Sequence, residues 1–273
     1  MSRNQDRVGT PRHHDTSPAP QQQPGFSFVV PTEFVELPSL GRFYPVGHPL
    51  HEKESIEIKQ MTAKEEDILT SRALLKKGIA IDRLLESLIV DRSIDPSTLL
   101  TGDRNAVIIA SRVSGYGNDY STEVSCPACD TKQNYSFDLN NASFVHGSFD
   151  EDLQVTDNRD GTFTCVLPKT QVTVVARLLT GKEEDKVANL NKSNNLISDQ
   201  LQNIILSVND DSTPQAIQYV AKNMPSFDSR HLRMVLKMAT PNIDLTQEFS
   251  CTECGHEQEM EVPLTVDFFW PDR

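Results

Sequence analysis

Apolar residues recur every three or four positions in several stretches of this 273-residue chain, which is the spacing of an amphipathic helix. Helix starts are also visible. Thr62 with Glu65, and Thr180 with Glu183, have the spacing of a capping box. The predicted helices are those starting at the two threonines, the segments 81–89 and 197–205, Asp103–Ser114 closed by Gly115, the stretch after Thr213, and 228–239.

Other stretches alternate between polar and apolar residues, as half-buried strands do. Ser55–Lys59 (SIEIK) alternates in this way, and Phe26–Leu37 is expected to be extended but interrupted by Pro31. Glycines and prolines predict an irregular loop at Pro38–Leu50. The chain therefore combines helices with short strands.

The two halves of the chain share a pattern that indicates an internal duplication. The stretch EVSCPACDTKQ from Glu123 matches EFSCTECGHEQ from Glu248 at a constant offset, and the same offset pairs Asp103 with Asp228. Upstream, TAKEED answers TGKEED and LPS answers LPK. Alternating residues flank each CxxC pair, which predicts a β-hairpin. We therefore expect an α+β fold in which one helical unit is used twice, as a pseudo-two-fold pair rather than a solenoid. The predicted divisions are a disordered arm at 1–25, repeat 1 at 26–144 and repeat 2 at 145–273.

The arm is rich in proline and glutamine and nearly free of apolar side chains. Such a segment buries too little surface to offset the entropy lost on ordering. No apolar h-region follows its basic residues, as a signal peptide requires, and no run of the chain is long enough to span a membrane. We expect a reducing compartment, where CxxC pairs favour metal or redox chemistry over structural disulfides.

The cysteines are the strongest candidates for chemistry. Two CxxC pairs supply the four soft ligands of a structural zinc site, and pseudo-two-fold packing would bring the two hairpins together. The alternatives are a redox pair, which would need a helix starting at the cysteines, and free thiols without metal. His256 could substitute as a ligand, although an exposed turn position is favoured, and Cys165 is expected in the core. The predicted zinc ligands are Cys126, Cys129, Cys251 and Cys254.

Charge and motifs narrow the function further. The net charge of −13 disfavours a general nucleic-acid binder, whose affinity comes largely from Lys and Arg on phosphates. The sequence holds no HExxH, GxGxxG or Walker loop, and the two KEED stretches fit the first turn of a helix better than acid–base chemistry. Arg230–Lys237 (RHLRMVLK) could touch phosphate, but a solvated helix face is favoured. We therefore expect no enzymatic activity.

Several distinctive motifs lie between Val35 and Leu139, namely LPSLGRFYP, MTAKEEDIL, GDRN with a GYG turn, and CPAC. Together they resemble the T4-type phage baseplate protein family, which includes the baseplate hub subunit and is similar to hub assembly factors. The resemblance implies a late structural or assembly protein of a contractile tail, with other hub or tail proteins as partners. It implies action in the host cytoplasm during assembly and a place in the virion tail baseplate, and it brings no catalytic residues.

Two hypotheses on function result. The first is a non-enzymatic component of the baseplate hub, or a factor for its assembly, that carries structural zinc. The second is a zinc-ribbon regulator that binds nucleic acid, which would need a basic stripe beside the cysteines. Acidic residues around both pairs argue against the second. In the loop Leu37–Pro45, Phe43 and Tyr44 offer aromatic area suited to a partner contact, and the alternative is that both rings pack in the core.

Overall fold

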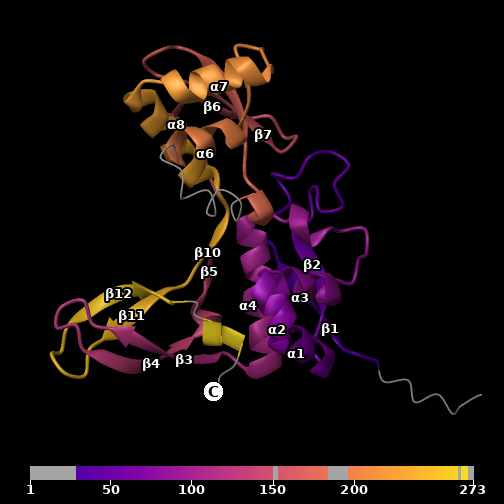
Figure 1. Cartoon of the computed structure of the whole chain (residues 1–273), viewed down its shortest axis with the longest axis vertical. Coiled ribbons are helices and arrows are strands. Elements are labelled where there is room, and N and C mark those ends of the chain that lie inside the picture. Colours follow the sequence, from indigo (N-terminus) through magenta and orange to yellow (C-terminus); the bar gives the residue numbers. More distant parts are fainter. Residues whose placement is uncertain (1–28, 150–152, 184–195, 264–265, 270–273) are drawn as a thin grey trace, which may run out of the picture. The chain divides into compact units, whose positions relative to one another are not determined.

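Helices alternate with short antiparallel strands along the chain (Figure 1), which confirms a mixed α+β fold. The computed structural model describes residues 29–149, 153–183, 196–263 and 266–269. Contacts divide the chain into the units Met1–Val30 and Pro31–Arg273, and the second unit holds every element named below. The predicted arm at 1–25 lies outside the described residues, so its disorder stays a prediction.

The first half starts with a two-stranded sheet and continues with helices and a hairpin. Strand β1 pairs with β2, and β3 pairs with β4, both in antiparallel register. The predicted strand at Ser55–Lys59 is confirmed as β2. The elements are β1 (Thr32–Glu36), β2 (Ser55–Lys59), α1 (Ala63–Thr70), α2 (Arg72–Lys77), α3 (Ala80–Leu88), η1 (Pro96–Thr98), α4 (Thr101–Tyr116), β3 (Asp119–Ser125), β4 (Lys132–Asp138), η2 (Leu139–Asn141) and β5 (Ser143–Val145).

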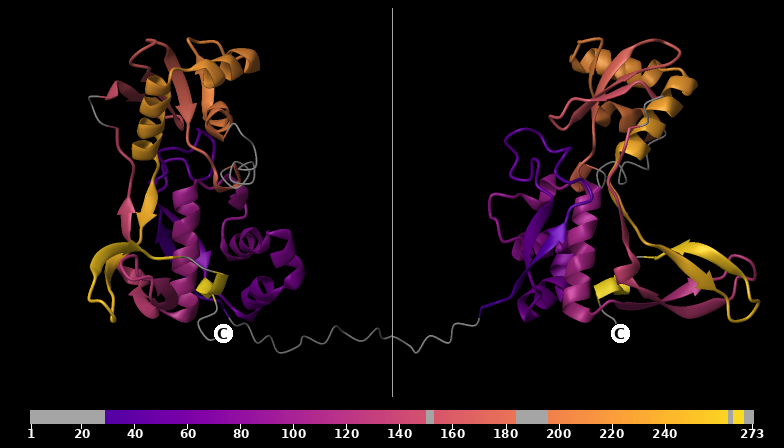
Figure 2. Two further views of the ribbon diagram at one scale, coloured as in Figure 1. Left: turned by 60° about the vertical axis from the view of Figure 1, so that its left-hand side comes forward. Right: turned by 180° about the vertical axis from the view of Figure 1, so that it is seen from behind.

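The second half also ends in a helix followed by a hairpin, but it starts with a four-stranded antiparallel sheet in the order β6-β7-β8-β9, which was not predicted from the sequence. Helices α6 and α7 pack against its strand β9 (Figure 2). The elements are β6 (Val155–Asp157), β7 (Thr162–Val166), β8 (Thr173–Arg177), α6 (Leu196–Ile204), β9 (Ile205–Val208), α7 (Pro214–Asn223), α8 (Ser226–Ala239), β10 (Asn242–Asp244), β11 (Thr246–Ser250), β12 (Glu257–Glu261) and η5 (Val266–Phe269).

The predicted helix starts are present. At α1, the Thr62 side chain accepts a hydrogen bond from the backbone and the Glu65 carboxylate accepts one from the Thr62 N–H at 3.0 Å, which completes the capping box. At the second site, Glu183 likewise accepts from the Thr180 N–H at 3.0 Å, and residues 181–183 are helical. The rest of the predicted helix falls on residues 184–195, outside the described residues.

The third predicted helix is longer than expected. Helix α4 runs from Thr101 to Tyr116 and ends at Gly117, so the prediction of a stop at Gly115 was wrong. Gly117 has a φ of 84°, which favours glycine, whereas Gly115 continues the helix and lies against the side chain of Met61. The second of two nearby glycines therefore ends the helix.

One buried carboxylate in each half ties a loop to a long helix. In the first half, Asp103 of α4 accepts hydrogen bonds from the Ser39 N–H at 2.9 Å and from the Tyr44 hydroxyl at 2.8 Å. The pKa of Asp103 is raised, because the effect of burial is larger than the opposite effect of the hydrogen bonds from Ser39 and Tyr44. In the second half, Asp228 of α8 accepts from the backbone N–H groups of Lys169 and Thr170 at 2.8 and 3.0 Å. The two contacts lie at positions that the sequence comparison pairs, while descent from one duplicated unit stays a prediction.

The aromatic residues predicted as a partner contact belong to the core instead. Phe43 is 3% exposed and Tyr44 is 2% exposed. Phe43 packs edge-on against Phe149, and Tyr44 stacks on His48. The alternative of core packing therefore describes both rings. A partner contact at this loop would use an exposed neighbour such as Val46, which is 73% exposed.

The C-terminal part of the second half packs against helix α4 of the first half. The Arg112 side chain of α4 is fully buried, and its guanidinium donates to the carbonyl oxygens of Phe268 at 2.7 Å and Asp119 at 3.1 Å. The Tyr120 hydroxyl donates to the Pro263 carbonyl at 3.0 Å. Strand β10 of the second half also pairs with β5 of the first. These contacts hold the two predicted repeats together.

Candidate metal centre

Each CxxC pair lies in the turn of an antiparallel hairpin, β3–β4 or β11–β12. In the first turn, the Asp130 N–H donates to the Cys126 carbonyl at 2.8 Å, and in the second the Gly255 N–H donates to the Cys251 carbonyl at 3.0 Å. Asp130 and Gly255 have φ values of 55° and 70°, the left-handed conformation predicted after each pair. The two turns therefore have the same backbone geometry, with both thiols of each pair on one side.

Side chains join the two hairpins along their length. Gln133 donates to the carbonyl of Ser250 at 3.2 Å and accepts from the Thr252 N–H at 3.0 Å. The Tyr135 hydroxyl donates to the Glu248 carbonyl at 3.0 Å. Both views of Figure 2 show the hairpins side by side, and these contacts align the turns at one end.

The alignment brings four thiols together from positions far apart in the sequence. Cys126 Sγ lies 3.7 Å from Cys254 Sγ, and Cys129 Sγ lies 3.8 Å from Cys251 Sγ. All four ligand atoms lie within 4.8 Å of one another, and no disulfide joins them. Four sulfurs placed tetrahedrally at a Zn–S distance of 2.3 Å would be about 3.8 Å apart. The spacing of the thiols thus fits a zinc ion, and the four-cysteine cluster could bind such a metal.

The thiol chemistry also fits a divalent cation. Hydrogen bonds with the side chain and the backbone of Thr131 lower the pKa of Cys129 to about 6. The pKa of Cys254 is raised to about 12, because interactions with the neighbouring thiols outweigh a hydrogen bond from the His256 backbone that lowers it. Without a cation, four adjacent thiols cannot all ionise. A coordinated metal removes this barrier, because a thiol that binds zinc is deprotonated.

The other two candidates lie apart from the cluster. His256 is half-buried, and its Nε2 lies 3.4 Å from the Gln258 amide oxygen. Cys165 is buried in β7, as the sequence predicts, and burial raises its pKa to about 11. Neither residue belongs to the group of close ligand atoms. Each CxxC pair is flanked by strands rather than followed by a helix, so the dipole of a thioredoxin-like site is missing here.

Exposed acidic residues surround the cysteines. Lys132 pairs with Glu123 at 2.7 Å, and the described residues of β11 and β12 contain no lysine or arginine. A nucleic-acid interface would need a basic surface here. The exposed acidic residues of the second hairpin are Glu248, Glu253, Glu257, Glu259 and Glu261.

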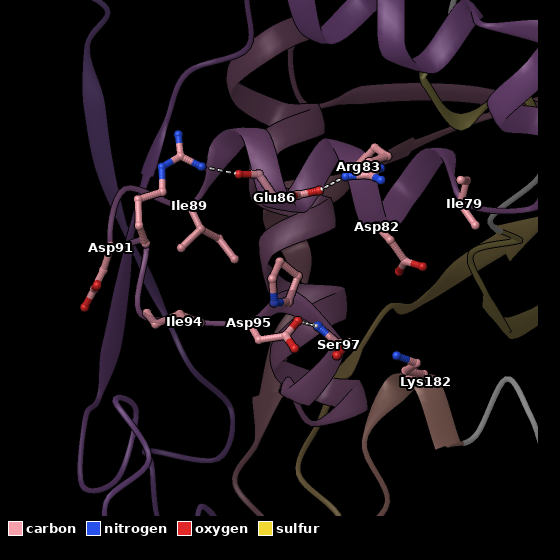
Figure 3. A pocket seen from close by; sticks show the side chains of 12 residues that line it. Ile79, Asp82, Arg83, Glu86, Ile89, Asp91, Ile94, Asp95, Ser97 and Lys182 are labelled. Carbon is pink, nitrogen blue, oxygen red and sulfur yellow. Dashed lines mark hydrogen bonds and ion pairs between the residues drawn. The ribbon is translucent and has the colours of Figure 1, made fainter.

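A pocket of about 490 Å³ beside α3 was not predicted from the sequence (Figure 3). Arg83 pairs with Glu86 at 2.6 Å, and the Asp95 carboxylate accepts from the Ser97 N–H at 2.9 Å. These three charged groups therefore bind one another or cap a turn. They do not form a nucleophile with an adjacent base, and no sequence motif marks this region.

None of the described helices is both long and apolar enough to cross a membrane.

Comparison with known proteins identifies the family of the chain. Neither the search of curated proteins nor that of solved structures returned a match. The model of the T4 bacteriophage base plate protein family matches residues 32–270, which is most of the chain and includes all four clustered cysteines. Membership implies a structural, generally non-enzymatic role in the phage tail baseplate, among other tail proteins. The chain belongs to the T4 bacteriophage base plate protein family.

Proposed function

We propose that this protein is a non-enzymatic component of the baseplate hub of a contractile phage tail, or a factor that assembles the hub, and that one structural zinc ion stabilises it. The main support for zinc is that two hairpins bring four thiols together at a spacing that fits tetrahedral coordination. The family match supports a role in the baseplate, and the place in the hub is our more specific inference.

A zinc ion at this position would link and stabilise the two hairpins. The hairpins are short, and their turns carry exposed polar residues with little core of their own. Four protein thiolates would fill the coordination sphere, whereas a catalytic zinc keeps one position open for water or substrate. The site therefore suits a staple between the two halves and not a reaction centre.

The same arrangement suits assembly by protein–protein contact. A metal that cross-links two hairpins fixes their exposed surfaces without a large core. The reducing host cytoplasm keeps thiols available for zinc during assembly. We infer that the chain acts there first and then occupies the tail baseplate with hub or tail proteins as partners.

The hub assignment is tested by cross-linking mass spectrometry of purified baseplates and of lysate from cells infected with phage that encodes a tagged full-length chain. Cross-links to proteins of the central hub are expected. Cross-links confined to peripheral baseplate proteins would contradict the hub and keep the family role.

The contribution of zinc to assembly is tested in the same phage. Cys251→Ser should lower the yield of complete tails, because it removes one predicted ligand. The matched control is Cys165→Ala, which changes a buried thiol outside the cluster and should leave the yield unchanged. Wild-type tail yield from a Cys251→Ser protein that lacks zinc would show that assembly does not depend on the metal.

A further inference from the structure

Helix α8 turns a face of mixed apolar and basic character to solvent. At 3.6 residues per turn, this face lies opposite the buried side of the helix, which includes Leu232 and Val235. Phe227 is 63% exposed and Met234 is 44% exposed, and they lie on one edge of the face. Basic residues occupy the other edge. The α8 face consists of Phe227, Arg230, Arg233, Met234 and Lys237.

The positive charges of the α8 face have no ionic partner in the part of the chain that the structure describes. No ion pair is found for Arg230, Arg233 or Lys237 among the residues that the structure describes. Asp228 is the single acidic residue of α8. It is buried and accepts hydrogen bonds from the backbone N–H groups of Lys169 and Thr170. The α8 face therefore stays positive in a chain whose net charge is −13.

The second hairpin has the complementary surface. Glu257, Glu259 and Glu261 alternate along β12 and all are exposed, so they lie on one side of the strand. Glu248 of β11 is directly opposite Glu259 in the register. Like charges in this position destabilise a sheet, and a positive partner would relieve their repulsion. The acidic face consists of Glu248, Glu257, Glu259 and Glu261.

We propose that the α8 face of one copy binds the acidic face of a second copy. The helix rises about 10 Å from Arg230 to Lys237, and the strand spans about 13 Å from Glu257 to Glu261. The three basic side chains of the α8 face can thus pair with the three glutamates of β12. Phe227 and Met234 would pack on the aliphatic parts of these glutamates. A second copy is the occupant because this chain itself carries a surface of matching charge and length.

Because the two faces are different surfaces of one chain, the contact can build a ring or an open array, or a two-fold dimer in which it occurs twice. It is separate from the hub assignment, since it concerns copies of this chain and can be measured with the purified protein alone. Exposed charges dominate the contact, and salt screens such pairs.

The test is sedimentation velocity of the zinc-loaded full-length chain at 50 and 500 mM salt. Self-association at low salt is expected, with a Kd that rises at least about tenfold at high salt. The triple variant Arg230→Glu/Arg233→Glu/Lys237→Glu should lose it. A matched control, Arg72→Glu/Lys76→Glu/Lys77→Glu, makes the same charge change on the exposed residues of α2 and should associate like the wild type.

Charge exchange separates the contact from a folding defect. Glu257→Lys/Glu259→Lys/Glu261→Lys should also be monomeric. Its mixture with the α8 triple variant should associate at one-to-one stoichiometry, because every contact between unlike chains again joins opposite charges, and a chain with both triple changes should self-associate again. A monomeric wild type at low salt, equal losses in the α2 control, or no recovery in folded charge-exchanged chains would overturn the proposal.

Discussion

The replacement of a single cysteine in either hairpin should disrupt the whole predicted zinc site. Cys126 and Cys251 come from different hairpins, yet the four ligand atoms lie within 4.8 Å of one another. Serine is a poor zinc ligand, so Cys126→Ser and Cys251→Ser should each leave three thiolates around the metal. Structural zinc binds with an apparent free energy of about 10 kcal/mol or more at neutral pH.

We expect each single variant to lose at least about 3 kcal/mol of this stabilisation, equivalent to a fall of about 5 °C in Tm for a chain of this length. The double variant should be little worse than either single one, because residues that act as a unit are not additive. Independent structural roles for the two cysteines would instead give losses that add.

The assay is metal analysis and calorimetric melting of the wild type, both single variants and the double variant, purified without chelator under reducing conditions. Cys165→Ala is the control, since this buried thiol lies outside the cluster and its variant should keep the zinc. Additive losses of stability, or zinc retained in both single variants at wild-type affinity, would refute the shared site.

Two further predictions concern the framework of the fold. Gly102→Ala should destabilise the protein by more than about 2 kcal/mol, because a Cβ there would lie 2.2 Å from the carbonyl oxygen of Pro241. Gly115→Ala, in the same helix but facing a flexible methionine at 3.3 Å, should be neutral or slightly stabilising in chemical denaturation; equal losses in both would show that the close approach is not what matters. The hydrogen bond from Arg177 at 2.6 Å lowers the pKa of Glu183 from 4.5 to about 2, so its stabilising effect is present above the unfolded pKa and is lost as the pH falls towards 2. Glu183→Gln should therefore cost about 1 kcal/mol at pH 7, after screening of this partly exposed pair by water, and nothing near pH 2; a cost that does not change with pH would exclude the ion pair as its cause.

The clustering of the four cysteines could be predicted from the sequence because two similar stretches carry them. The two CxxC stretches match at a constant offset, and soft ligands at this spacing have few other uses in a reducing compartment. The turn after each pair was also predictable, since Gly255 adopts a left-handed conformation freely and Asp130 tolerates it. Local chemistry and a repeated pattern were therefore sufficient for this part.

Features that depend on distant contacts were missed. Arg112 appears in the sequence as an ordinary helix residue, but its guanidinium is buried against the carbonyl of Phe268 near the other end of the chain. Phe43 and Tyr44 stand in an irregular loop, where no periodicity separates buried from exposed positions. The sheet of β6–β9 was missed because its strands are only three to five residues long. Only the three-dimensional packing decides these cases.

The central claim is that one zinc ion joins the two hairpins through four thiolates of a single chain. It is tested most directly by native mass spectrometry of the reduced full-length chain, purified without chelator, combined with X-ray absorption spectroscopy of the metal. We expect one zinc ion per monomeric chain, bound by four sulfurs at about 2.3 Å. A metal-free chain, or zinc bound by fewer than four sulfurs, would contradict the claim.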